Sequence, residues 1–379
     1  MIKVLVLAKS IDGGTGTYAL DLLKLKDFFD KKFQIRIYAL ERPSYRSRFP
    51  RKDVFFLRNK KFYPESYLLL FSNLKNFFEE ILLVKEKIKS YNPDVILGID
   101  IHANLLIQIN KLLFFGKLKT VLTTHIDLAK TVSDKSTPFI KCVLKNFVRF
   151  FYRSADCLVF VSRGLAKEFS RDFGIKKKVV VIYNGIEIST KIRPKRSNPK
   201  TPVILTLARL VEQKDHASLI KAFAFLQNEI KSSSLWILSD GPERKKLLRL
   251  AEKLGLKGKV RFWGWVKDTS PYFRKSSLFV LSSKREGFGY ALVEAMSYGL
   301  PTVSTDTPFG PSEILDKGKY GILVPVGSPL AIKNAMLRIL SDPSIYRSYS
   351  RKSLDRASYF SLEKMLGEYQ KLIISVGRR

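Results

Sequence analysis

The sequence predicts an α/β protein with two domains, each built around a parallel β-sheet. Short apolar or alternating segments recur along the chain and are separated by segments with helical periodicity, an alternation typical of parallel sheets covered by helices on both faces. A polar, proline-containing break at 189–202 divides the alternation into two series. At 379 residues the chain is long enough for each series to bury a core of its own.

The first series predicts strands at 3–8, 34–39, 53–57, 95–99, 120–124, 157–162 and 179–183, with helices such as 67–90 and 137–154 between them. The second series predicts strands at 203–207, 234–239, 260–263, 278–281 and 302–304. We therefore expect Rossmann-like domains at 1–192 and 200–360 that face each other across a cleft. Ligands of such sheets bind at the carboxyl ends of the strands.

The segment 282–296 is the most informative for function. Glu286 follows the predicted strand 278–281, and Glu294 lies eight residues later in a helical pattern, so both carboxylates point to about the same side. Gly287 and Gly289 let a ligand approach the backbone, and the first helical N–H groups suit an anion. Carboxylates that bind hydroxyls beside a phosphate site suit a nucleotide sugar. In the alternative interpretation, Glu286 caps the helix and Glu294 is a solvated helix residue.

This segment resembles the Glu-x7-Glu signature of the retaining glycosyltransferases with the GT-B fold, called family 4 or glycosyl transferases group 1. Residues 206–215 resemble the family's Gly-Arg-Leu-x-x-x-Lys block, with Ala208 in place of glycine, and 239–243 resemble its Gly-x-Gly-Pro turn, with Ser239 in place of the first glycine. Further blocks match at 182–186, 262–268 and 310–314. The resemblance covers nearly the whole chain, more weakly in the first half. It implies the GT-B fold, with the final helix at 361–379 returning to the first domain.

The resemblance implies a phosphate site made of cations. Arg209 and Lys214 stand at the end of the second domain's first strand, where family members bind the donor diphosphate. The alternative for either residue is a solvated charge. No Asp-x-Asp pair occurs in the chain, so the usual ligands of a metal-bound sugar nucleotide are missing. We expect no metal and no cofactor, and a UDP- or GDP-linked sugar as substrate.

The resemblance also assigns the remaining contacts. Gly13 and Gly14 fall in a loop over the donor diphosphate and the acceptor, although the turn 12–17 alone could be an ordinary tight turn. His125 falls beside the transferred sugar, with a structural histidine as the alternative. The expected roles of the second-domain residues are donor contacts: Glu286 orients the sugar hydroxyls, Glu294 the ribose, Phe288 and Gly289 the phosphate, and Trp265 and Val266 the base. Of the other histidines, His102 could line the same cleft, whereas His216 is expected at the surface of a helix start.

The implied reaction is sugar transfer with retention of configuration. No residue can be assigned to a double displacement, so the resemblance implies attack on the front face, in which the departing phosphate takes the acceptor proton. The acceptor is expected to be a saccharide or lipid-linked saccharide of envelope polysaccharide or glycolipid synthesis. A lipid- or nucleic-acid-binding module on an inactive scaffold is the alternative. A phosphorylase is disfavoured, because no pyridoxal-binding lysine block occurs.

The net charge of +34 needs a separate explanation. The segment 31–61 is dense in cations, among them Arg46, Arg48, Arg51 and Lys52, and another four cations recur every fourth residue at Lys141, Lys145, Arg149 and Arg153. An anionic membrane surface, nucleic acid or a solvated surface would each explain them. Nucleic acid is disfavoured, because no nucleic-acid-binding motif accompanies the cations. We expect a cytoplasmic protein at the inner face of the plasma membrane, since Cys142 and Cys157 are too few for a disulfide framework and no segment predicts a span or a signal peptide.

Overall fold

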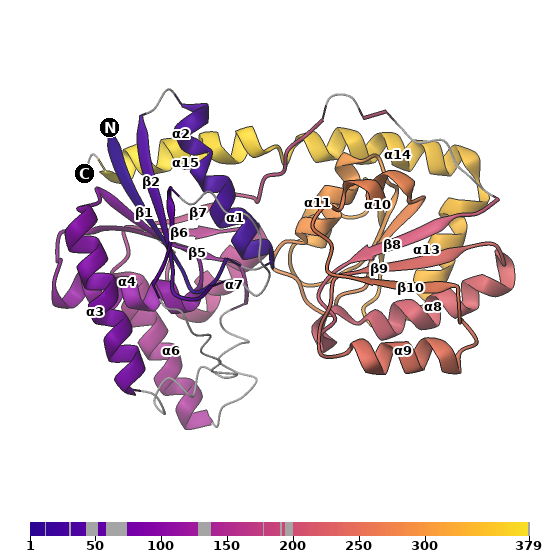
Figure 1. Cartoon of the computed structure of the whole chain (residues 1–379), viewed down its shortest axis with the longest axis horizontal. Helices are drawn as coiled ribbons and strands as arrows, with labels where there is room; N and C mark the ends of the chain where they lie inside the picture. Colours follow the sequence, from indigo (N-terminus) through magenta and orange to yellow (C-terminus); the bar gives the residue numbers. More distant parts are fainter. Residues whose placement is uncertain are drawn as a thin grey trace. The chain divides into compact units, whose positions relative to one another are not determined.

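The chain folds into two compact units, Met1–Gly185 with Leu362–Arg379 and Ile186–Ser361. The structure is a computed structural model that describes residues 1–11, 13–29, 32–42, 52–57, 74–127, 138–176, 178–189, 192–193 and 200–377, without the side chains of 74 and 138–141. The boundary falls at Gly185, before the predicted break at 189–202, much of which lies outside the described residues. Figure 1 shows the helices and strands of both units.

Unit 1 is built on a parallel sheet. Its described strands are β1 (Ile2–Ala8), β2 (Phe33–Ala39), β3 (Val54–Phe56), β4 (Val95–Gly98), β5 (Lys119–Thr124), β6 (Cys157–Phe160) and β7 (Val179–Val181). They pair in the order β3-β2-β1-β4-β5-β6-β7. The strands β2 and β3 lie on one side of β1, whereas β4 and the strands that follow it lie on the other side. The carboxyl ends of β1 and β4 therefore form the switch point at which such sheets bind ligands.

The helices of unit 1 cover both faces of this sheet. Those that the structure describes are α1 (Gly13–Leu23), α2 (Leu25–Phe28), α3 (Leu74–Tyr91), α4 (Ile101–Leu113), α6 (Pro138–Arg153), α7 (Arg163–Phe173) and the returning α15 (Leu362–Gly377). Figure 1 shows α1, α2 and α15 on one side of the strands and α3, α4 and α6 on the other. Met365, Leu366 and Ile373 of α15 are buried in the same core as β1 and β4, so the C-terminal helix is an integral part of unit 1.

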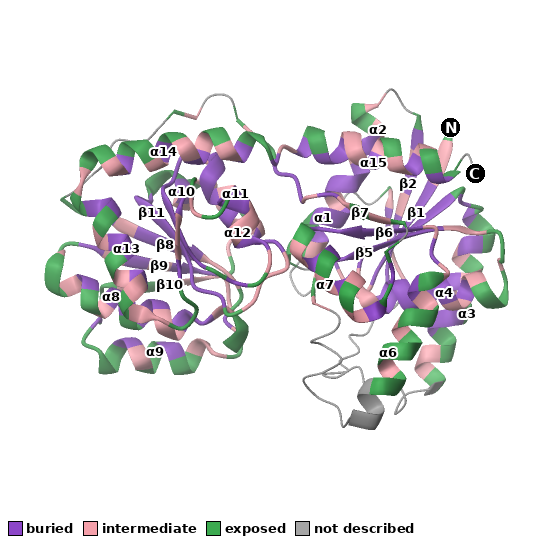
Figure 2. Cartoon of the chain, turned by 180° about the vertical axis from the view of Figure 1, so that it is seen from behind, coloured by how far each residue is buried: buried purple, intermediate pink, exposed green. Residues whose placement is uncertain are grey.

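Unit 2 has its own parallel sheet and core. The described strands, in the order β10-β9-β8-β11-β12-β13, are β8 (Val203–Leu207), β9 (Ser234–Leu238), β10 (Val260–Gly264), β11 (Leu278–Leu281), β12 (Thr302–Thr305) and β13 (Ile322–Val324). The helices are η2 (Glu212–Lys214), α8 (His216–Glu229), α9 (Arg244–Lys253), α10 (Ser270–Lys275), α11 (Tyr290–Ser297), α12 (Pro311–Ile314), α13 (Pro329–Ser341) and α14 (Pro343–Ser358). Figure 2 shows the strands of both units mostly buried between helices whose outer faces are exposed.

The predicted strands all occur, whereas β13 was missed. It has only three residues, two of them partly exposed, and lies at the edge of the sheet. Among the described helices, none combines the length and the apolar composition that a membrane span requires.

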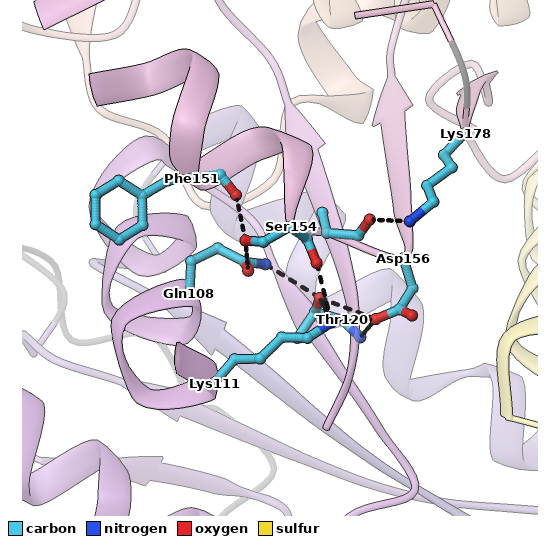
Figure 3. A network of polar contacts seen from close by, with 8 residues as sticks. Gln108, Lys111, Thr120, Phe151, Ser154, Asp156 and Lys178 are labelled. Atoms are coloured by element: carbon cyan, nitrogen blue, oxygen red, sulfur yellow. Dashed lines mark hydrogen bonds and ion pairs between the residues drawn. The ribbon is translucent and has the colours of Figure 1, made fainter. Parts of the chain in front are cut away.

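A polar network joins α4, β5 and the start of β6 at the amino ends of these strands (Figure 3). The Lys111 ammonium contacts the Asp156 carboxylate at 2.5 Å, and the Thr120 backbone N–H donates to the same carboxylate at 2.9 Å. Burial alone would raise the pKa of Asp156, but these donors overcome it and hold the pKa below its usual value. The network lies at the edge of the sheet opposite to the carboxyl ends, so we interpret it as structural.

Candidate functional site

The residues of unit 2 that are predicted to bind the phosphates and the sugar lie at the switch point of its sheet. The chain builds β9 and β10 on one side of β8 and β11–β13 on the other, which makes the carboxyl ends of β8 and β11 the switch point. Arg209 and Lys214 follow β8, and Glu286 follows β11. Because β8 and β11 are neighbours in the sheet, the loops that carry these residues lie side by side.

Lys214 and Glu286 form an ion pair between the two loops. The Lys214 ammonium lies 2.7 Å from Oε1 of Glu286, and the Ser283 hydroxyl donates to the same oxygen at 2.7 Å. The two side chains are 21% and 9% exposed, so the pair is largely shielded from solvent. The Ser282 hydroxyl also donates to the Lys214 carbonyl at 3.0 Å. Sequence reasoning missed Ser282 and Ser283, because a serine beside a strand end carries no distinctive pattern.

Arg209 is held through its backbone while its side chain stays exposed. The next residue, Leu210, donates its N–H to the Asp240 carbonyl at 3.0 Å and accepts from the Glu243 N–H at 3.0 Å, which fixes this loop against the 239–243 turn. Within the described part of the chain, no ion pair involves the Arg209 guanidinium. The cation is therefore available to an anionic ligand.

Two glycines allow these loops to approach one another. A side chain at Gly241 would place its Cβ 2.4 Å from the Leu210 carbonyl oxygen, and one at Gly310 would place it 2.1 Å from the Phe288 carbonyl oxygen. The segments 239–243 and 310–314, which match blocks of the family, thus pack closely against the loops that carry the predicted site residues. Ser239, which replaces a family glycine, has a φ of 92°, a conformation that favours glycine.

Gly289 starts the helix that carries Glu294. It occupies the position before α11 with a φ of 104°, and no side chain caps the helix. The interpretation of Glu286 as a helix cap is therefore wrong. An uncapped helix N-terminus beside Arg209 and Lys214 at the same sheet edge favours the binding of an anion.

Glu294 lies in the second turn of α11 and is not a freely solvated residue. The Thr269 hydroxyl donates to its Oε1 at 2.6 Å. Burial raises its pKa, and the Thr269 hydrogen bond opposes that increase. Thr269 lies in the turn after β10, which also carries the half-buried Val266 and the 43% exposed Trp265. The structure thus brings the predicted ribose and base contacts to neighbouring elements.

In unit 1, His125 follows β5 beside a cluster of hydroxyl groups. Its Nε2 lies 3.2 Å from the Thr123 hydroxyl oxygen, and its ring packs edge-on against Tyr18 with the centroids 4.6 Å apart. Burial lowers the pKa of His125 to about 4, so the imidazole is neutral at physiological pH.

The glycine-rich turn leads directly into α1, although Asp12 itself lies outside the described residues. Gly13 has a φ of 64° and starts the helix, and a Cβ at either Gly13 or Gly14 would meet no atom within 4 Å. At Gly16, in contrast, a Cβ would lie 1.9 Å from the Ile11 carbonyl oxygen. Gly16 is thus required for packing, whereas Gly13 and Gly14 leave open space in which a ligand could approach the backbone.

The other two histidines differ from their predictions. His102 is buried and forms a 2.7 Å contact with the buried Glu80 carboxylate, so it is part of the helix packing and does not line an open site. His216 does begin α8, but it is only 1% exposed, because it packs beneath the Arg209 loop and its Nε2–H donates to the Arg209 carbonyl at 3.2 Å. Because histidine is polar, the sequence favours a surface position. The structure buries the side chain instead, where it donates a hydrogen bond to the loop carbonyl.

His216 should make unit 2 sensitive to acid. Burial lowers its pKa to about 4, whereas an unfolded histidine titrates near 6.5. Between these values the unfolded state binds the extra proton, so the free energy of unfolding should fall by about 3 kcal/mol as the pH falls from 6.5 to 4. All three tryptophans, Trp236, Trp263 and Trp265, lie in unit 2, so urea unfolding followed by tryptophan fluorescence reports on this unit.

The matched variant is His216→Gln, whose amide can still donate to the Arg209 carbonyl but does not titrate. We expect its stability to decline less than that of the wild type over the same pH range. Parallel curves for the two proteins would show that His216 is not the sensitive group.

Comparisons with known proteins agree with this arrangement. Residues 12–190 match the family model described as Glycosyltransferase Family 4, and residues 187–356 match the one described as Glycosyl transferases group 1. The lipopolysaccharide core biosynthesis glycosyltransferase LpsE of Rhizobium meliloti is 33% identical over 230 residues, which cover 59% of this chain and 66% of LpsE.

Two further matches extend over more of the related proteins. One is the N-acetylgalactosamine-N,N'-diacetylbacillosaminyl-diphospho-undecaprenol 4-alpha-N-acetylgalactosaminyltransferase of Campylobacter jejuni, which is 28% identical over 73% of this chain and 77% of its own length. The other is the crystal structure of Anabaena HepE in complex with UDP, with a TM-score of 0.77 and 20% identity over 99% of this chain and 100% of HepE. This structural likeness shows the shared fold. With both halves of the chain matched, the protein belongs to the family 4 glycosyltransferases, enzymes of the GT-B fold that transfer sugars.

Proposed function

We propose that this enzyme transfers a hexose-type sugar from a UDP- or GDP-linked donor to a saccharide or lipid-linked acceptor, with retention of configuration and without a metal ion. The observation that carries the proposal is the Lys214–Glu286 pair at the switch point of unit 2, where the exposed Arg209 follows β8 and the uncapped α11 follows β11. This is a site with cations for a diphosphate and carboxylates for hydroxyls. The acceptor class follows the names of the relatives, which act in lipopolysaccharide core synthesis and on a diphospho-undecaprenol-linked saccharide.

We assign the donor contacts as follows. Arg209, Lys214 and the backbone at Phe288 and Gly289 stabilise the charge that grows on the leaving diphosphate. Glu286 accepts hydrogen bonds from the sugar hydroxyls through the oxygen that Lys214 and Ser283 do not bind. Glu294 and the turn at Trp265 and Val266 hold the ribose and the base, and the backbone at Gly13 and Gly14 approaches the diphosphate.

His125 is suited to orient the sugar rather than to remove a proton. A group whose pKa is about 4 is a weak base at neutral pH and would contribute little to deprotonating an acceptor hydroxyl. The departing phosphate is the stronger candidate for that role, which corresponds to front-face attack and retention. We therefore assign His125 to a hydrogen bond with a hydroxyl of the transferred sugar.

The test of this function is nucleotide release from a panel of UDP-, GDP- and ADP-sugars, with the anomeric configuration of the product determined by NMR. Slow release of UDP or GDP from one sugar nucleotide, and a product with the donor's configuration, would support the proposal. An inverted product, or no release from any donor, would contradict it.

The same assay tests metal independence. We expect turnover to survive an excess of EDTA, because cations take the place of a metal at the diphosphate and no Asp-x-Asp pair occurs. The control is the EDTA-treated enzyme with Mg²⁺ restored in excess. A loss of turnover in EDTA that Mg²⁺ reverses would show that Arg209 and Lys214 do not suffice.

We further propose that the enzyme binds an anionic membrane surface through unit 1. The cations at 46, 48 and 51 lie outside the described residues, as does the side chain of Lys141. In α6, however, Lys145, Arg149 and Arg153 are exposed at four-residue spacing. Val143, Phe147 and Phe150 are exposed on the same helix, with Phe150 61% exposed. Exposed apolar side chains among cations are typical of a helix that lies in a membrane interface.

The triple variant Lys145→Glu, Arg149→Glu, Arg153→Glu should lose most of its co-sedimentation with anionic vesicles. Each cation near such a surface contributes on the order of 1 kcal/mol, and salt weakens the attraction. The control reverses three exposed cations of α9 in unit 2, Lys245, Lys246 and Arg249, and so changes the net charge equally. Equal losses in both variants would indicate a general charge effect. Wild-type protein that binds neutral vesicles but not anionic ones would contradict the proposal.

A further inference from the structure

Two buried side chains, Thr123 and Tyr18, contact His125. The Thr123 hydroxyl lies 3.2 Å from Nε2 of His125, and the Tyr18 ring packs edge-on against the imidazole. The Tyr18 hydroxyl of α1 is in turn hydrogen-bonded to the Tyr369 hydroxyl of α15. Tyr18, Tyr369 and Thr123 are at most 1% exposed. Burial raises the pKa of both phenols, so each hydroxyl keeps its proton at neutral pH.

The direction of the hydrogen bond between Thr123 and His125 follows from the other partners of the Thr123 hydroxyl. This hydroxyl lies 2.9 Å from the Gly98 carbonyl oxygen and 3.2 Å from the Ile99 carbonyl oxygen, which can only accept, so the single Thr123 proton is donated to these carbonyls. A lone pair of the Thr123 oxygen then accepts from His125 Nε2–H, so that both of these groups have a partner.

We propose that Thr123 is a positioning residue that holds His125 in the Nε2–H tautomer, so that its Nδ1 accepts a hydrogen bond from a substrate hydroxyl. Tyr18 also restrains the ring plane, since the two rings pack at 71° to each other. The inference rests on the proposed function, in which His125 contacts the transferred sugar. Because Tyr369 is hydrogen-bonded to Tyr18, the returning helix α15 also helps to position the ring.

Nuclear magnetic resonance of the ¹⁵N-labelled imidazoles tests the tautomer without any substrate. The chain has three histidines, so the signals of His125 are identified by their loss in His125→Asn. In the wild type we expect His125 to be protonated at Nε2 and not at Nδ1. His216 serves as an internal reference, because its Nε2–H donates to a carbonyl.

The variants separate the Thr123 hydrogen bond from general packing. Thr123→Val keeps the side-chain shape and removes the acceptor, so we expect the Nδ1–H tautomer to become populated and kcat to fall about tenfold, with the donor KM changed less than about twofold. Thr123→Ser should restore both. Tyr369→Phe removes the partner of the Tyr18 hydroxyl and loosens the ring against which His125 packs, so we expect an unchanged tautomer and a kcat that falls less than in Thr123→Val. Tyr346→Phe, at a tyrosine of α14 that is also buried, is the control and should change neither.

The outcomes are distinct. An Nδ1–H tautomer in the wild type, or an unchanged tautomer in Thr123→Val, overturns the inference, and a normal kcat in Tyr369→Phe removes α15 from it. A wild-type enzyme that releases no nucleotide contradicts the proposed function instead, while the tautomer measurement still decides how His125 is held.

Discussion

Replacing Glu286 with alanine is expected to lower kcat at least about a hundredfold while unit 2 stays folded, as the loss of a positioned transition-state contact typically does. Two effects combine in this variant. The sugar hydroxyls lose the acceptor that we propose for them, and the Lys214 ammonium loses the carboxylate that holds it 2.7 Å away. The cation that we propose to bind the phosphate is therefore displaced as well. Steady-state kinetics of nucleotide release measure the effect. Arg209→Ala and Lys214→Ala should each abolish most of the activity.

A second ion pair between the same two loops provides the control. Lys284 and Glu212 lie 2.9 Å apart, but their side chains are 42% and 79% exposed. Exposed pairs contribute little, so Glu212→Ala should leave kcat nearly unchanged. Glu294→Ala should mainly raise the donor KM, because the ribose contact that we propose for Glu294 would be equal in the ground and transition states. Near-normal kinetics in both Glu286→Ala and Glu294→Ala would show that this pair does not bind the donor.

The fold and the positions of the candidate residues in it could be predicted because they depend on local patterns. Buried strands alternating with amphipathic helices predict parallel sheets, and the carboxyl ends of parallel strands meet at one edge. Residues that follow neighbouring strands, such as Lys214 and Glu286, are therefore brought together. Their direct contact depends on strand order, since β8 and β11 are neighbours although two strands lie between them in the chain.

What the sequence could not predict depends on contacts between distant residues. His216 looked like an exposed residue at a helix start, yet the carbonyl that it binds belongs to the Arg209 loop. The bond between Tyr18 and Tyr369 joins residues 351 positions apart in the chain, which no local pattern indicates. The buried Glu80 that pairs with His102 lies on a different helix. Helix and strand periodicity cannot identify such partners.

Gly310→Ala is expected to disable the donor site from outside it. The new Cβ would lie 2.1 Å from the Phe288 carbonyl oxygen, a backbone atom that can move only with the loop that starts α11. Alanine would also have to adopt the φ of 82° of Gly310, which costs about 1 kcal/mol or more by itself. We expect the donor KM to rise and kcat to fall, so that kcat/KM drops about a hundredfold.

Gly327→Ala tests the cost of a positive φ without a steric clash. Gly327 has a φ of 71°, but a Cβ at this position would meet nothing within 4 Å. The variant should therefore lose about 1 kcal/mol of stability in urea unfolding followed by tryptophan fluorescence, with normal kinetics. If Gly310→Ala behaved like Gly327→Ala, the Phe288–Gly289 backbone would not contribute to donor binding. A loss of activity confined to Gly310→Ala would instead show that the position of this backbone, held by contact with a glycine from the next loop, is what the leaving diphosphate requires.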